Sequence, residues 1–133
     1  MAGGPDARAR ARSAGVLRAL CADIVDVRGA VLSSSDGLVV VAEPASENSA
    51  EVAAMAAALV ALAQQLGSAV VGGRLEDCCV RTASGVVCLV AVTERHVLSV
   101  GTGGGVPLGL VLRQSRTAAA VLSRILDDQL DVV

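Results

Sequence analysis

The chain contains no phenylalanine, tyrosine or tryptophan, and it contains no lysine, so arginine supplies its basic side chains apart from one histidine. Without aromatic rings the protein offers no surface on which nucleic-acid bases could stack. Its formal net charge of -2 provides no general attraction for phosphate polyanions. We therefore expect no nucleic-acid partner. The missing lysine also excludes a Walker A phosphate site and Schiff-base chemistry.

Hydrophobic residues nevertheless make up 53% of the 133 positions, so the core must be built from aliphatic side chains and cysteine. This length allows one domain, which buries roughly two-thirds of the surface of the unfolded chain and needs no disulfide or metal to fold. The mean hydropathy of +0.64 is high for a chain that we do not expect to enter a membrane. It indicates additional buried surface, which association with another protein would supply.

No apolar run is long enough for a typical membrane span. The longest, residues 52–63, lies between Glu51 and Gln64, whereas a spanning helix needs about 20 residues. We interpret this run as a buried helix and expect no membrane partner. The arginine-containing segment 1–12 is predicted to be a flexible tail, with an organellar transit peptide as the alternative. Residues 13–128 are predicted to form one domain, and residues 129–133 a frayed C-terminus.

The four cysteines, Cys21, Cys78, Cys79 and Cys88, show no CxxC spacing. In a strand, the adjacent pair Cys78 and Cys79 would point to opposite faces of the sheet, where they could not easily share a metal. We interpret all four as small apolar side chains of the core type. Free thiols suit a reducing cytoplasm, where we expect the protein to be located. No metal and no other cofactor is expected.

Hydrophobic periodicity predicts the order helix, two strands, long helix, three strands, helix. The first helix begins at Ser13, and Asp36-Gly37 is a strong hairpin signal between the first two strands. Gly85 belongs to a second turn, and the last helix begins near Pro107. Short hairpins favour an antiparallel sheet, and its apolar faces require helices on both sides. The predicted class is α/β of the α+β type.

The long helix, residues 49–66, carries apolar side chains on two faces. Asn48 and Glu51 fit a capping box at its start, and Gly67 fits a stop at its end. One stripe contains large side chains: Val52, Met55, Leu59, Leu62 and Leu66. The other is mostly alanine: Ala53, Ala56, Val60 and Ala63. A surface helix needs only one such stripe. We predict that the large stripe covers the sheet and the alanine stripe meets a second subunit; the alternative is a central helix inside a monomer.

No catalytic constellation can be assembled from the sequence. Residues 101–105 are glycine-rich and precede a helix, but they lack the lysine and spacing of a phosphate loop. We interpret them as a connector, with a small-ligand site as the alternative. His96 is expected at the surface. Catalysis by a cysteine and a histidine would need Cys88 to face His96 across a hairpin, and no activating third group can be identified. We predict no catalytic residue and no enzyme activity.

These patterns resemble the roadblock/dynein light chain family. The resemblance rests on the Ser35–Leu38 turn, the alanine-rich helix 49–66, the strand pair turned at Gly85 and the opening of the last helix at 109–112. It extends over residues 14–126. It implies a profilin-like, five-stranded antiparallel sheet. The long helix would lie on one face of this sheet and the two terminal helices on the other.

The resemblance also implies homodimers, or heterodimers with a paralogous roadblock protein, in which the third strands pair and the long helices pack together. In this sequence the implied dimer interface consists of Ala53, Ala56, Val60, Ala63, Leu75, Cys79 and Val80. The composition suggests a GC-rich bacterial genome, and bacterial members accompany Ras-like GTPases. The implied function is a non-catalytic dimeric platform that binds and regulates a small Ras-like GTPase. The alternative is a structural adaptor or light-chain subunit of a larger assembly.

Overall fold

The computed structural model describes residues 4–131, and the side chains as far as residue 128. The elements within this range are α1 (Ala7–Asp23), β1 (Val27–Ser34), β2 (Val39–Glu43), α2 (Ser49–Val70), β3 (Asp77–Thr82), β4 (Gly85–Thr93), β5 (His96–Gly103) and α3 (Leu108–Asp131). The strands form one antiparallel sheet in the order β2-β1-β5-β4-β3. The predicted fold class and element order are confirmed, and β2 and β3 are the edges of the sheet.

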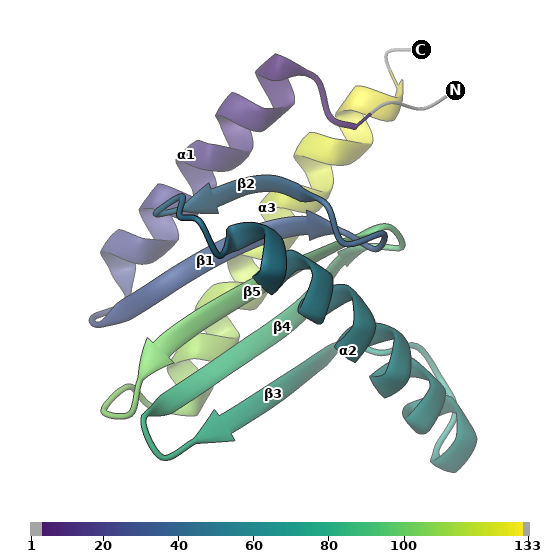
Figure 1. Ribbon diagram of the computed structural model, residues 1–133. Coiled ribbons are helices and arrows are strands. Elements are labelled where there is room, and N and C mark those ends of the chain that lie inside the picture. Colours follow the sequence, from purple (N-terminus) through teal and green to yellow (C-terminus); the bar gives the residue numbers. More distant parts are fainter. Residues whose placement is uncertain (1–3, 132–133) are drawn as a thin grey trace.

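The helices divide between the two faces of the sheet (Figure 1). α1 and α3 pack against each other and cover one face, whereas α2 crosses the other face alone. The main core lies on the α1–α3 side, where Leu17 and Leu122 pack with Leu98 of the central strand β5. A much smaller buried cluster lies under α2. The two-sided arrangement implied by the resemblance is therefore present, but the two sides are covered very unequally.

The first helix starts earlier than the sequence suggested. The Asp6 carboxylate accepts a hydrogen bond from the Ala9 N–H at 2.8 Å and caps α1, and Ala9 itself is buried. The predicted flexible tail is thus wrong for residues 7–12; residues 1–3 lie outside the described residues. At the other end, α3 remains helical to Asp131. The predicted frayed segment 129–133 is therefore helical over 129–131, and residues 132–133 lie outside the described residues.

The helix α2 has different ends from those predicted. Gly67 lies inside it, and the chain leaves the helix through Gly72 and Gly73, whose φ angles are 86° and 90°. This left-handed conformation favours glycine and ends many helices. At the start, Asn48 makes no side-chain capping bond, because its carboxamide oxygen accepts a hydrogen bond from the Ser46 hydroxyl at 2.6 Å. The predicted capping box is therefore absent.

The glycine-rich segment 101–105 is mostly strand. Gly101 and Gly103 belong to β5 and pair with β4. At Gly85 of β4 a Cβ atom would lie 2.0 Å from the Thr102 carbonyl oxygen, so the two backbones approach too closely for any side chain there. The predicted connector is correspondingly short and begins after Gly103.

Candidate interaction surface

The alanine stripe of α2 faces the sheet of its own chain. Ala53 is 0% exposed and Ala56 is 5% exposed. Ala56 packs in a cluster with Leu89 of β4 and Val97 of β5. The small side chains let the helix lie close to the sheet. Assigning Ala53 and Ala56 to the dimer interface was therefore wrong, because both side chains are already buried within one chain.

The large side chains of α2 point away from the sheet instead. Met55, Leu62, Leu66 and Val70 are 63%, 65%, 66% and 75% exposed. We call these four residues the exposed stripe. Met55 and Leu62 are about two helical turns apart, and Leu66 and Val70 follow at intervals of about one turn. The four side chains therefore lie along one side of α2. The prediction that Met55, Leu62 and Leu66 cover the sheet was wrong, since the alanine side of the helix already does so. Exposed apolar surface of this extent usually marks an interaction site.

The sheet also leaves apolar side chains uncovered on the α2 side. Val80 of β3 and Val87 of β4 are paired neighbours, and they are 39% and 37% exposed. Alternation along β4 places Val87 on the same face as Leu89, which packs against α2. α2 contacts mainly β1, β2 and β5, so β3 and the adjoining part of β4 remain open. Within the described chain β3 also has one unpaired edge.

The remaining residues of the predicted interface occupy different surroundings. Val60 and Ala63 are half-buried on α2, and Leu75 is half-buried just before β3. Val80 faces the open side beside α2. Cys79 is exposed but lies on the opposite face, because its partner Cys88 belongs to the core beneath α3. Among the predicted interface residues, Val80 alone is both exposed to solvent and on the α2 side of the sheet, where the exposed stripe lies.

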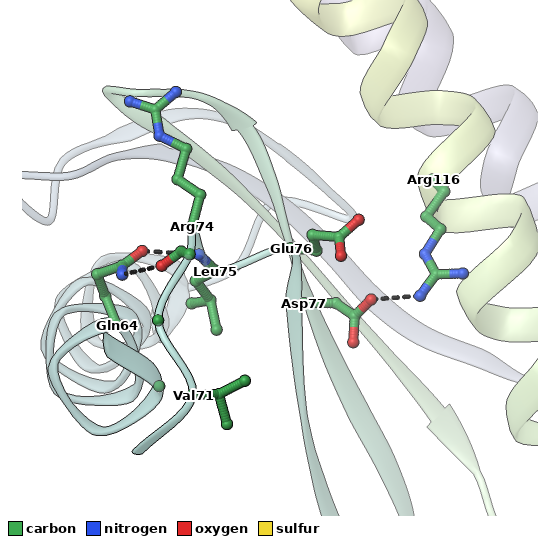
Figure 2. Close-up of a pocket in the computed structure, with 10 residues that line it drawn as sticks. Gln64, Val71, Arg74, Leu75, Glu76, Asp77 and Arg116 are labelled. Atoms are coloured by element: carbon green, nitrogen blue, oxygen red, sulfur yellow. Dashed lines mark hydrogen bonds and ion pairs between the residues drawn. The ribbon is translucent and has the colours of Figure 1, made fainter. Parts of the chain in front are cut away.

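A hollow of about 370 Å³ lies where the chain passes from α2 into β3. Figure 2 shows Gln64 directed toward Leu75 on one side, and Arg116 of α3 directed toward Asp77 on the other. The Gln64 Oε1 atom accepts a hydrogen bond from the Leu75 N–H at 2.7 Å. Its Nε2 atom donates to the Gly73 carbonyl at 3.1 Å and the Ser68 hydroxyl at 2.7 Å. Gln64 therefore ties the connection before β3 back onto α2.

Replacing Gln64 with alanine is expected to loosen this connection. The variant loses three hydrogen bonds, and at a half-exposed position their combined loss should cost about 1–2 kcal/mol of unfolding free energy. Amide hydrogen exchange across residues 72–76 should accelerate accordingly. The exposed neighbour Gln65 gives the matched control, because Gln65→Ala should leave exchange in this segment unchanged. Equal exchange in Gln64→Ala and wild type would show that the Gln64 side chain does not hold the connection.

The structure does not bring Cys88 and His96 together. Cys88 pairs with Val100, whereas His96 lies opposite Thr93 and Ser34. His96 is half-buried rather than at the surface as predicted, and its Nδ1 atom shares a hydrogen bond with the Thr93 hydroxyl at 2.8 Å. Burial lowers the pKa of His96, and the nearby Arg95 charge lowers it further. Among the described residues, no group of three or more His, Cys, Asp or Glu side chains is placed to hold a metal ion.

In the described part of the chain, α2 is the one helix that is long and apolar enough to cross a membrane by length and composition alone. Two contacts, however, attach α2 to the rest of the domain. Its alanine side packs against the sheet, and its C-terminal end is hydrogen-bonded to the connection before β3. α2 is therefore a layer of the domain that presents one apolar side outward.

Comparison with known proteins identifies the fold. Solved structures of MglB from Myxococcus xanthus and of the gliding protein MglB from Thermus thermophilus align with TM-scores of 0.83 and 0.82. They share 18% and 20% identity, cover 97% and 96% of this chain, and are themselves covered to 96% and 95%. A Roadblock/LC7 domain from Streptomyces avermitilis aligns with a TM-score of 0.79 at 22% identity, over 84% of this chain and 95% of that one.

The sequence comparisons differ in what they found. A search of the curated proteins found no match. Residues 14–102, however, match the sequence profile of the Roadblock/LC7 domain. This match spans well over half of the chain and includes α2, β1 to β4, most of β5 and most of α1. The chain therefore belongs to the Roadblock/LC7 domain family.

Proposed function

We propose that this protein is a non-catalytic dimeric platform that binds and regulates a small Ras-like GTPase. The observation that carries the proposal is the exposed stripe on α2, which a single chain leaves in water. Membership of the Roadblock/LC7 family supports the association with a GTPase system. The protein would act conformationally, by binding the GTPase and positioning the GTPase's own catalytic residues.

The chemistry of α2 supports a second copy, or a paralogous roadblock protein, as the cover for the exposed stripe. No charged residue occurs between Glu51 and Arg74, so the outward side of the helix offers nothing to a charged partner. Each large side chain of the stripe would contribute roughly 1.5–3 kcal/mol if it became fully buried. A twofold axis beside α2 would set two identical apolar stripes against each other, which is a self-complementary contact.

The edge of the sheet supports the same arrangement. β3 is six residues long and has no neighbour on its outer side within the described chain. Pairing with β3 of a second copy would continue the sheet and remove this edge. It would also bring apolar surface next to Val80 and Val87. A related solved structure is described as MglB with a tetrameric arrangement, which supports self-association as a property to test here.

The GTPase partner can be tested by capture from a lysate of the source organism. The immobilised chain would be incubated with GDP in one sample and with a non-hydrolysable GTP analogue in the other. We expect a small Ras-like GTPase to be retained in one nucleotide state, because a regulator must distinguish the two states energetically. Retention of no GTPase in either state would contradict the proposal and favour a structural adaptor subunit.

A membrane is the competing cover for the exposed stripe, and vesicle flotation separates the two possibilities. We expect the chain to stay at the bottom of the gradient with both neutral and anionic vesicles. Flotation with neutral vesicles would indicate insertion of the apolar side of α2 into lipid, and would contradict a protein partner at this surface.

A further inference from the structure

Two cysteines face each other across the β3–β4 hairpin. Cys79 and Cys88 are directly paired in the register, and their Sγ atoms are 3.4 Å apart, with the Cys79 thiol donating to Cys88. Counted outward from the two-residue turn at 83–84, this pair falls on a non-hydrogen-bonded position, where opposed Cα atoms lie about 4.5 Å apart. That spacing is within the range of about 4.4–6.8 Å that disulfides require.

The surroundings single out this pair among the four cysteines. Cys79 is exposed whereas Cys88 is fully buried, so one thiol can meet a reagent and the other can react only with its neighbour. Cys78 pairs with Leu89 and lies on the opposite face of the sheet. Cys21 is on α1, where its thiol lies 3.8 Å from the Glu43 carbonyl oxygen. The exposed stripe lies on the other face of the sheet, so a partner seated on that stripe would not cover the face of β3 that carries the Cys79 side chain.

We propose that Cys79 and Cys88 form a reversible cross-strand disulfide, which makes the β3–β4 hairpin a redox-responsive site. The oxidant is a low-molecular-weight disulfide such as oxidised glutathione. Cys79 loses its proton and attacks one sulfur of that disulfide, forming a mixed disulfide and releasing one thiolate, which takes up the proton. The Cys88 sulfur then attacks Cys79 Sγ and expels the second thiolate, which receives the Cys88 proton. Two protein thiols are oxidised by two electrons, and the small disulfide is reduced to two thiols.

The order of the two steps follows from burial. Burial, together with the hydrogen bond from Cys79, raises the pKa of Cys88 to about 12. Cys88 therefore remains a thiol, while the exposed Cys79 reacts first. In the second step the proximity of the two sulfurs compensates for the low acidity of Cys88, because the attack occurs within one hairpin.

The test uses the full chain in glutathione buffers of increasing oxidised fraction, followed by alkylation of remaining thiols. Trypsin cuts after Arg74, Arg81 and Arg95, so Cys79 and Cys88 lie on separate peptides, 75–81 and 82–95. Mass spectrometry of the digest without reduction should find these two peptides joined. The intact monomer, measured before alkylation, should be lighter than the reduced chain by two hydrogen atoms. Because peptide 75–81 also contains Cys78, the variants Cys78→Ser and Cys79→Ser identify which sulfur is linked.

Cys78→Ser should retain the linked peptides, and Cys79→Ser should lose them. Neither position is buried in the way that Cys88 is, so both variants are expected to fold. Retention of the link in Cys79→Ser with its loss in Cys78→Ser would overturn the assignment. The proposal would also be overturned if the fully oxidised buffer gave no intramolecular link, or if a covalent dimer formed in its place.

Discussion

Leu62→Glu is expected to convert the protein from a dimer into a folded monomer. Leu62 is 65% exposed in the single chain, so its replacement removes little that the fold depends on. In the proposed dimer, however, the carboxylate would have to leave water and enter an apolar contact without a partner. Such burial typically costs about 3 kcal/mol, which weakens association by roughly two orders of magnitude. A twofold dimer contains the change twice, so the total effect is larger.

Size-exclusion chromatography with light scattering and refractive-index detection measures this effect, because a chain without tryptophan or tyrosine absorbs little at 280 nm. Val25→Glu is the matched control: Val25 is 83% exposed in the turn between α1 and β1, away from α2. It should leave the dimer intact. A Leu62→Glu protein that associates as tightly as wild type would exclude the exposed stripe as the interface.

Ala56→Arg is expected to destabilise the single chain itself. Ala56 lies between α2 and the sheet, in contact with the cluster that contains Leu89 and Val97. An arginine there has no room and no buried partner, which should cost about 3–5 kcal/mol. For a domain of this size that corresponds to a fall in melting temperature of roughly 10–20 °C. Thermal unfolding followed by circular dichroism provides the measurement.

Ala58→Arg gives the comparison on the same helix. Ala58 is exposed and lies on the outward side of α2 between Met55 and Leu62. This variant should stay folded as a monomer while losing the dimer, because the Ala58 side chain is not packed against the sheet. If Ala56→Arg instead kept the fold and lost only the dimer, the alanine stripe would be the interface after all, as the helical pattern first suggested.

The sequence was sufficient to predict the order of the elements and the hairpins between consecutive strands, but not the pairing of β1 with β5 or which side of α2 meets the sheet. The Asp36-Gly37 turn and the helical periodicities are local signals, and the structure bears them out. Periodicity identifies two apolar sides of α2 without ranking them. The choice depends on how closely the helix approaches the sheet. Near the β1–β2 turn, a Cβ atom on Gly37 would lie 3.2 Å from the Ala54 Cα atom, so the turn and the backbone of α2 approach each other closely.

The start of α1 and the end of α2 also differ from the sequence-based prediction. Arginine-rich sequence near the N-terminus was interpreted as a tail, although arginine is a good helix former and Asp6 supplies a cap. Gly67 was interpreted as a stop, although a glycine is tolerated in a helix and the left-handed residues Gly72 and Gly73 follow it. At the N-terminus the local signals do favour a helix, whereas at Gly67 the helix continues to the glycines that follow it.

The pairing of Cys79 with Cys88 shows how sensitive the candidate sites are to register. The sequence pattern placed Gly85 in the turn, whereas the structure places it in β4 opposite Thr82. A shift of one residue in such a hairpin exchanges the faces of every side chain along one strand. Only the observed register places the two thiols side by side and leaves Val80 and Val87 on the side of α2.

The mass of the wild-type chain in solution tests the central claim most directly. Sedimentation equilibrium with interference optics would be carried out over a range of micromolar concentrations. Burial of two exposed stripes against each other predicts a species of twice the 13.2 kDa chain mass, or a higher even multiple. A single species of 13.2 kDa throughout that range would contradict the account, because the apolar side of α2 would then be stable in water without a partner.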